Sequence, residues 1–231
     1  MNEEQPHRQG AFFGRRKGKP LRAHQADLLT VLLPYLAIDL TEPPPAKLAA
    51  LFRVPVEEVR LEIGFGGGEH LIAQALANPN AGFIGIEMFV NGMAKALAAI
   101  ETHNLQNIRL HHGDAADLIA WLPDRALSRI DMLYPDPWPK RRHWKRRFIN
   151  ERSIAALARI LRQGGDFRFA SDWPHYAAWT LRRVLRSSAF EWTAECADDW
   201  RKPWPDFSGT RYEAKARREG RTPCYLTFRR V

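Results

Sequence analysis

The sequence predicts an α/β fold in which helices cover both faces of a doubly wound, mostly parallel β-sheet. Two observations indicate this Rossmann-like class. Short apolar segments of strand length alternate with segments of helical periodicity between residues 59 and 186. A glycine-rich turn directly follows the first of these strands, as in sheets that bind a nucleotide beyond the carboxyl ends of their strands.

The expected elements follow one another in a regular order. The leucine spacing predicts a first helix over 25–38, and the Pro-rich segment 41–45 ends it. Two late strands are not separated by a clear helix, so we expect an antiparallel strand at the edge of the sheet. The predicted strands are 59–63, 81–86, 107–111, 130–134, 165–170, 190–194 and 225–228, and the helices after the first five strands are 71–77, 90–100, 115–122, 148–161 and 176–186.

Length and composition restrict the possible classes of protein. A chain of 231 residues, 45% of them hydrophobic, suits one domain, which we place at 25–231 behind a flexible basic arm at 1–24. No apolar run approaches the ~20 residues that span a bilayer, and the first residues lack the apolar core of an export signal. The two cysteines and eight histidines show no metal-ligand spacing. We therefore expect a cytoplasmic protein without disulfides, a metal, a membrane segment or an obligate protein partner.

The net charge of +9 is unevenly distributed. Residues 61–135 contain four basic and eight acidic side chains, so this stretch carries −4 and the remainder +13. The positive charge concentrates in the N-terminal arm, in the run 140–147 and in the tail from residue 211. Basic edges around an acidic centre suit a protein that binds a polyanion and a small molecule of another charge, although a solvated surface would have a similar composition.

The strongest local motif is the turn Glu62-Ile-Gly64-Phe-Gly66-Gly-Gly-Glu69. A dinucleotide fingerprint would read Gly-x-Gly-x-x-Gly, whereas here an acid precedes the first glycine by two residues. A carboxylate repels a pyrophosphate but pairs with an ammonium group. S-adenosylmethionine carries an ammonium and a sulfonium and no phosphate. We therefore assign Glu62, Gly64 and Gly66 to an S-adenosylmethionine site; a glycine turn without a ligand is the alternative.

Two further acids stand at the ends of the next predicted strands. Glu87 can accept hydrogen bonds from both ribose hydroxyls of an adenosine. Asp114 can accept one from the adenine amino group, or it can cap the following helix. Either acid alone is a weak signal, but three acids at three successive strand ends predict an adenosyl pocket.

The segment after the fourth strand combines prolines, tryptophans and cations. It reads Pro135-Asp136-Pro-Trp-Pro-Lys140, followed by Arg142-His-Trp-Lys-Arg-Arg147. The two prolines restrict the backbone around Asp136 and hold its carboxylate over the predicted cofactor site. Tryptophans among Lys and Arg are typical of surfaces that stack bases and hold phosphates, so Arg142, Lys145, Arg146 and Arg147 are predicted RNA contacts. A rigid loop before a solvated basic helix is the alternative.

From about Arg15 onward the chain resembles the bacterial tRNA (guanine-N7)-methyltransferases, which have the class I methyltransferase fold. The resemblance rests on the motifs above, on Ser171-Asp172 and on Thr210-Arg211-Tyr212-Glu213. It implies methyl transfer from S-adenosylmethionine to N7 of a guanine in tRNA, the variable-loop guanine at tRNA position 46. It also implies roles for particular residues: Glu62, Glu87, Asp114 and Asp136 at the cofactor, Asp136 as the catalytic residue, and Lys140, Asp172, Thr210, Arg211, Tyr212 and Glu213 at the substrate.

The chemistry of guanine agrees with an acidic site. N7 has a free lone pair at neutral pH, so its attack on a sulfonium methyl group needs alignment and electrostatic stabilisation rather than a general base. The opposite edge of guanine presents N1–H and N2–H₂ donors, which Asp136, Asp172 or Glu213 can accept. The residues alone leave open which of the three does so.

Three other functions fit parts of the sequence. The glycine spacing and Glu62 disfavour an NAD-dependent oxidoreductase. Methyltransferases acting on exocyclic amines or on protein often carry Asn/Asp-Pro-Pro-Tyr/Phe here, whereas Trp138 follows Pro137 in this chain. The acids at all three cofactor positions disfavour an inactive RNA-binding module.

Overall fold

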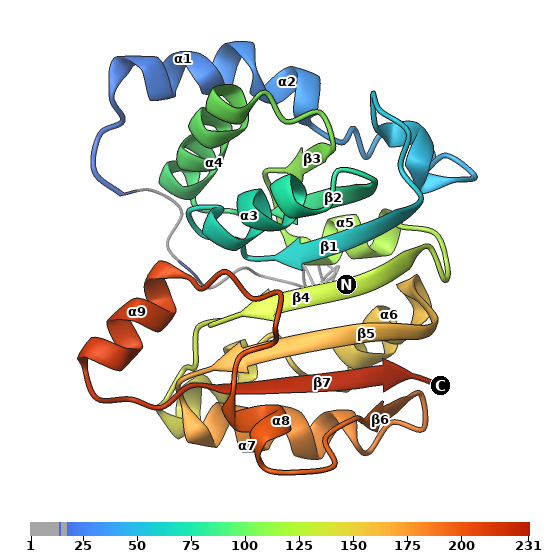
Figure 1. The fold of residues 1–231 in the computed structure, drawn as a ribbon, viewed down its shortest axis with the longest axis vertical. Coiled ribbons are helices and arrows are strands. Elements are labelled where there is room, and N and C mark those ends of the chain that lie inside the picture. The colour runs from blue at the N-terminus through green and yellow to red at the C-terminus, as the bar shows by residue number, and fades with distance from the viewer. Residues whose placement is uncertain (1–13, 15–17) are drawn as a thin grey trace, which may run out of the picture.

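One seven-stranded sheet forms the centre of the molecule (Figure 1). The computed structural model describes residue 14 and residues 18–231, so the predicted arm at 1–24 lies largely outside the described residues. The strand order is β3-β2-β1-β4-β5-β7-β6. The strands are β1 (Glu58–Ile63), β2 (Ala81–Ile86), β3 (Ile108–His111), β4 (Leu127–Leu133), β5 (Leu161–Ser171), β6 (Phe190–Trp192) and β7 (Cys224–Arg230).

The pairing confirms the predicted fold class. Strands β1 to β5 are parallel, and β7 is antiparallel to both β5 and β6. The antiparallel strand lies next to the short outermost strand, because β7 inserts between β5 and β6.

The helices that follow the first five strands also lie where the periodicity predicted them. The expected first helix is divided at Leu32, two residues before Pro34, whose ring and missing N–H prevent a continuous helix. Two short helices in the segment between β6 and β7 were not predicted. The helices are α1 (Ala23–Val31), α2 (Leu33–Leu36), α3 (Glu69–Ala77), α4 (Val90–His103), α5 (Ala115–Trp121), α6 (Glu151–Ile160), α7 (Pro174–Val184), α8 (Asp198–Arg201) and α9 (Arg211–Arg218), with single 3₁₀ segments η1 (Leu48–Leu51) and η2 (Arg141–Arg146).

The two faces of the sheet have separate apolar cores. The neighbours Phe83 and Ile84 of β2 belong to different clusters, because successive strand residues point to opposite faces. Phe83 packs with α1, α2, α3 and α4, and Ile84 with residues of α5, α6 and α7. Burying both faces gives β4 seven buried residues in succession.

Charged residues replace part of the core on the face that α3 covers. The buried Arg129 of β4 contacts Asp131 at 2.9 Å, Asp206 at 2.7 Å and the Gln74 side chain at 2.5 Å. Arg168 of β5 contacts Asp206 at 2.8 Å. These five residues, here called the Asp206 cluster, fasten the segment that precedes α9 to the sheet.

Candidate active site

The candidate site lies at the carboxyl ends of the parallel strands. The strand order changes direction at β1, which has β2 on one side and β4 on the other, and ligands bind at such switch points. These strand ends are on the left in Figure 1, where α9 lies beside them.

The glycine-rich turn after β1 has a backbone that side chains disfavour. Gly64, Gly66 and Gly68 have φ angles of 72°, 60° and 83°, in the left-handed region that glycine adopts readily. Helix α4 approaches this turn so closely that a Cβ atom on Gly92 would lie 2.1 Å from the Gly66 carbonyl oxygen. The turn and the helix are therefore packed backbone to backbone.

Glu87, at the end of β2, also holds the turn. Its carboxylate accepts hydrogen bonds from the Gly66 N–H at 2.7 Å and the Phe89 N–H at 2.8 Å. Burial raises the pKa of Glu87 despite these bonds and the nearby Arg211. The predicted ribose-binding acid thus lies directly beside the glycine turn.

Glu62 is buried at the end of β1 and is paired with a residue that sequence reasoning missed. Its Oε2 lies 2.9 Å from Nδ1 of His70, whose side chain is 1% exposed. Asp114 caps α5, accepting a hydrogen bond from the Ala116 N–H at 2.9 Å. The capping considered for Asp114 is therefore present, at a strand end on the cofactor side of the sheet.

Asp136 lies in a constrained loop between β4 and η2. Tyr134 and Trp138, two residues to either side, have φ angles of 52° and 41°, which are unusual for residues with a Cβ. Asp136 is exposed, but the protein atoms around its carboxyl group partly exclude water from it, and this desolvation raises its pKa. Among the described residues it has no hydrogen-bond or ion-pair partner, so its carboxylate is available to a ligand.

Arg147 requires a correction, since it was predicted to contact RNA but is 2% exposed. Its guanidinium donates to the Pro137 carbonyl at 2.9 Å and lies 3.1 Å from Nδ1 of His175. It also packs against aromatic rings of Trp144, Tyr176 and Trp179, with centroids at 4.8–5.2 Å. Arg147 fastens the Asp136 loop to α7 and offers no surface to a phosphate.

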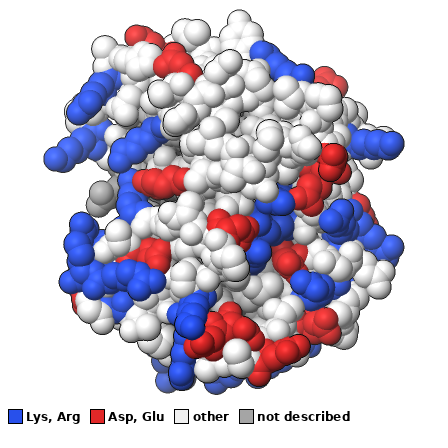
Figure 2. Space-filling view, in the orientation of Figure 1, with Lys and Arg blue, Asp and Glu red and all other residues white. Residues whose placement is uncertain are grey.

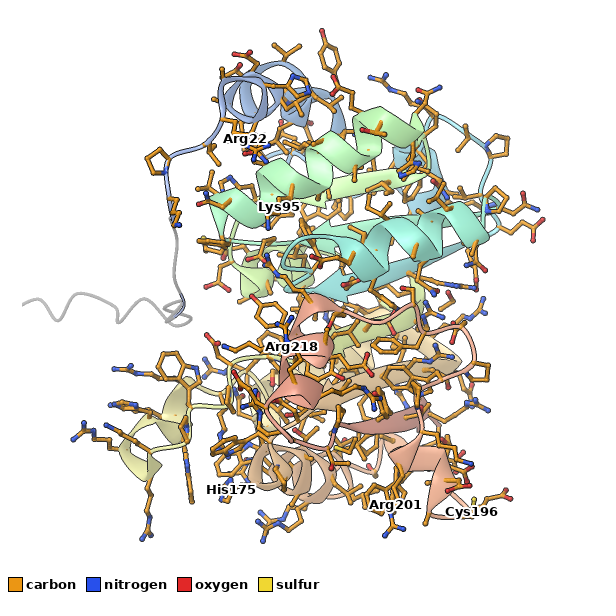
Figure 3. The ribbon with its side chains drawn as sticks, turned by 60° about the vertical axis from the view of Figure 1, so that its left-hand side comes forward. Arg22, Lys95, His175, Cys196, Arg201 and Arg218 are labelled. Atoms are coloured by element: carbon orange, nitrogen blue, oxygen red, sulfur yellow. The ribbon has the colours of Figure 1, made fainter. Side chains whose placement is uncertain are left out.

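The other cations of the run are at the surface. Lys140, Arg142 and Lys145 are exposed, and Arg146 lies over the Trp138 ring at 4.8 Å. Trp144 connects η2 to α7, with ring centroids 4.6 Å from His175 and 5.5 Å from Trp179. Figure 3 shows η2 projecting from the molecule with its side chains outward.

Helix α9 brings the Thr210–Glu213 segment to the cofactor side. A Cβ on Gly66 would lie 3.2 Å from the Tyr212 ring and 3.4 Å from the Arg211 guanidinium, so both residues lie against the turn. Thr210 caps the helix by accepting from the Glu213 N–H at 3.1 Å. This Thr-x-x-Glu capping pattern could have predicted α9 from the sequence.

The two remaining acids predicted at the substrate are already paired. Glu213 is buried and contacts both the Tyr225 hydroxyl and the Arg217 guanidinium at 2.7 Å. Burial and Glu213 raise the pKa of Tyr225 to about 12. Asp172 contacts Arg221 at 2.5 Å and lines an open hollow of about 530 Å³ with Trp173, Pro174, His175, Gly220, Arg221 and Thr222.

Comparisons with known proteins agree with these motifs. The model of a family described as "Putative methyltransferase" matches residues 57–226. A tRNA (guanine-N(7)-)-methyltransferase of Rhodopseudomonas palustris (strain BisB5) is 64% identical over 231 residues, covering 100% of this chain and 90% of the relative. The chain belongs to the tRNA (guanine-N7)-methyltransferase family. Another member of this methyltransferase family, from Agrobacterium fabrum, is 57% identical over 218 residues and 94% of each chain.

Comparison with solved structures shows that the chain has the class I methyltransferase fold. A precorrin-6y C5,15-methyltransferase of Geobacter metallireducens matches 79% of this chain and 86% of its own with a TM-score of 0.53. At 15% identity this likeness concerns the fold alone. Within residue 14 and residues 18–231, no group of three or more His, Cys, Asp or Glu side chains could hold a metal, and no helix is long and apolar enough to cross a membrane.

Proposed function

We propose that this chain transfers the methyl group of S-adenosylmethionine to N7 of a guanine in tRNA, the guanine at position 46 that the family resemblance implies. One observation carries the assignment of the site: the Thr210–Glu213 segment lies against the glycine turn, with Tyr212 and Arg211 beside Gly66. Residues attributed to substrate and to cofactor therefore meet at one place.

The acids at the strand ends fit S-adenosylmethionine. One Glu62 oxygen, Oε1, has no hydrogen-bond partner among the described residues and is available to the ammonium group of the cofactor. Glu87 would accept from the ribose hydroxyls and Asp114 from the adenine amino group. Gly64 and Gly66 let the cofactor approach the backbone. When bound, S-adenosylmethionine supplies an electrophilic methyl group on a positively charged sulfur.

The residues around this group would align and stabilise the guanine. Its N7 lone pair needs no base, and methylation places positive charge on the imidazole ring of guanine, which a carboxylate stabilises. Asp172 and Glu213 are each held by an arginine, whereas Asp136 has no such partner in the described chain. We therefore assign to Asp136 the acceptance of the guanine N1–H and N2–H₂ donors, and to Asp172 and Glu213 the support of the surrounding loops.

A basic surface beside the site would hold the phosphates of tRNA. The exposed cations of η2 adjoin α7, which contains no acid and has Arg182 and Arg183 in its last turn; Arg186 follows two residues after its end. In the described chain none of these three arginines has an ion-pair partner. Figure 2 shows Lys and Arg at the lower left, and in Figure 3 Arg22, Lys95 and Arg218 lie one below another, above His175. Phosphate contacts of this kind position an RNA without reading its sequence.

The remaining organisation follows from this function. We propose that residues 1–24 act as a basic arm in front of a methyltransferase domain at 25–231, and that the enzyme acts on tRNA in the cytoplasm.

The test replaces Asp136 by Asn and by Ala. Methyl transfer to unmodified tRNA would be followed with labelled S-adenosylmethionine, and N7-methylguanosine would be mapped by reductive cleavage. Both variants should bind S-adenosylmethionine but transfer the methyl group at least about 10²-fold more slowly, because the donor edge of guanine loses its charged acceptor. Asp124→Asn removes a carboxylate that is 72% exposed at the far end of the sheet, and it should transfer normally. Normal transfer by folded Asp136→Ala would refute the role of Asp136, and methylation at another atom would refute the function.

A further inference from the structure

Two buried side chains beside the glycine turn form a pair in which Glu62 is assigned to the cofactor and His70 has no role in the proposed reaction. His70 Nδ1 and Glu62 Oε2 are 2.9 Å apart, and the two side chains are 1% and 6% exposed. His70 lies at the start of α3, immediately after the glycine turn, and its ring packs 5.5 Å from that of Phe207. The imidazole therefore fixes one oxygen of the carboxylate that we assign to the cofactor ammonium.

The second ring nitrogen of His70 indicates that this histidine does more than fill space. Nε2 is buried without a hydrogen-bond partner among the described residues, and so is Oδ1 of Asp131. Asp131 and Glu62 occupy paired positions in the parallel strands β4 and β1, so both carboxylates lie on the face that α3 covers. The imidazole thus lies in the field of two buried carboxylates, of which only Glu62 is hydrogen-bonded to it.

The charges of this region balance when His70 is protonated. Asp206, next to Phe207, is linked to Asp131 through Arg129. Glu69, which is in α3 like His70, is exposed and faces Arg211 instead. The charged groups linked to this pair are the carboxylates of Glu62, Asp131 and Asp206, the last of them 39% exposed, and the guanidinium groups of Arg129 and Arg168. Three anions face two cations, so an imidazolium makes the set neutral.

A ligand ammonium at Glu62 would disturb this balance. It would add one positive charge beside the carboxylate that stabilises the imidazolium, and the release of one proton from His70 would restore neutrality. We propose that His70 is a positioning residue that orients Glu62 toward the ammonium of S-adenosylmethionine and gives up one proton when the cofactor binds. This inference rests on the proposed function, because it takes Glu62 as the ammonium contact.

The acid–base behaviour of the free protein is consistent with this coupling. Burial would lower the pKa of His70, but Glu62, through charge and hydrogen bond, and Asp131 outweigh burial and the repulsion of Arg129, so the pKa is raised. The free protein therefore carries the imidazolium up to a higher pH than an isolated histidine would. Below that pH, cofactor binding must displace the proton, so affinity falls as the pH falls.

The proton release can be measured by calorimetry of S-adenosylmethionine binding in two buffers of different ionisation enthalpy. The wild type should release close to one proton, and its Kd should rise by up to about tenfold for each pH unit of acidification below the raised pKa of His70. His70→Asn keeps a donor for Glu62 but cannot titrate, so it should bind with a smaller proton release and a flatter pH profile. His70→Phe removes the donor as well and should bind more weakly than His70→Asn at every pH.

Two controls separate the pair from other titrating groups. His24→Asn removes an exposed histidine that lies 2.7 Å from Glu101, and it should behave as the wild type. Methylthioadenosine has no ammonium group, so its binding should release no proton from His70. The amino group of S-adenosylmethionine titrates equally with every variant, so the difference between wild type and His70→Asn isolates the imidazole.

A measurement on the wild type guards against variants that fail to fold. The His70 ring resonance, followed by NMR, should titrate at a lower pH when S-adenosylhomocysteine is bound and at an unchanged pH with methylthioadenosine. Equal proton release by wild type and His70→Asn, or an unshifted His70 titration, would overturn the coupling while leaving the methyltransferase assignment intact. Failure of the wild type to bind S-adenosylmethionine at any pH would instead overturn the proposed function.

Discussion

Replacing Arg147 by Lys tests whether this residue fastens the Asp136 loop or contacts RNA. The substitution keeps the positive charge but removes the planar guanidinium group, which donates to the Pro137 carbonyl, lies within hydrogen-bond distance of His175 and packs against three aromatic rings. An ammonium can replace one of these hydrogen bonds and cannot stack in the same way.

The cost can be worked out from these contacts. Losing one hydrogen bond of a charged donor costs about 1.5–3 kcal/mol, and losing a desolvated cation–π contact costs roughly 1–2 kcal/mol. We therefore expect Arg147→Lys to lower the free energy of unfolding by about 3 kcal/mol. For a chain of this size the melting temperature should fall by roughly 6–12 °C.

Activity should change in a characteristic way. The loop that carries Asp136 loses its attachment to α7, so kcat should fall by about 10²-fold, as misplaced catalytic groups commonly produce, while KM for tRNA changes little. Thermal unfolding measures the melting temperature, and methyl transfer at several tRNA concentrations measures kcat and KM. Arg142→Lys, an exposed change on the same segment that keeps the positive charge, should leave the melting temperature and kcat unchanged. If Arg147→Lys melted like the wild type and raised only the KM for tRNA, the buried attachment would be the wrong explanation.

Two other predictions concern charges. Burial would raise the pKa of Asp206, but Arg168 and Arg129 hold this pKa below its usual range. The Asp206 carboxylate therefore stabilises the fold fully above the unfolded-state pKa of about 3.9, and this stabilisation is lost as the pH falls through the lower folded-state pKa. Asp206→Asn should therefore unfold about 1–2 kcal/mol more easily at neutral pH, a moderate cost because Asp206 is 39% exposed, and urea titrations of the two proteins should converge in acid; a constant difference would contradict this. Replacing Arg182, Arg183 and Arg186 together by Gln should weaken tRNA binding, leave S-adenosylmethionine binding unchanged and reduce the slope of log Kd against log salt by about 2–3; an unchanged slope would exclude phosphate contacts there.

The elements with apolar periodicity could be predicted from the sequence because burial on one or both faces of a sheet requires it. The strands at 59–63 and 81–86 and the helices that follow them appear at or close to the predicted positions. The glycine turn was also predictable, because its spacing and the strand before it restrict the backbone strongly. These features depend on residues that are close together in the sequence, so the sequence alone is enough to predict them.

What could not be predicted depends on contacts between distant residues. Arg129 and Asp131 give β4 the alternation of a half-exposed strand, yet both are buried because Asp206, 77 residues after Arg129, completes their pairing. Arg147 is similar, since only the fold brings the carbonyl of Pro137 and the rings of α7 around it. Helix α9 has too small a core contact for apolar periodicity to indicate it, since only Glu213 and Ala216 of its eight residues are buried, so its Thr-x-x-Glu capping pattern is the local signal for it.

The close packing of α4 on the glycine turn has a consequence for turnover. Because Gly92 and Glu87 hold the turn in the free protein, a ligand that binds there does not bear the entropy of ordering it, about 1–2 kcal/mol per residue for a flexible backbone. S-adenosylhomocysteine has the same adenosine and the same ammonium as the methyl donor, so it gains equally from the prearranged turn. A rigid turn therefore favours retention of the spent product, and exchange of one nucleoside for the other becomes a step that can limit the rate of successive methylations.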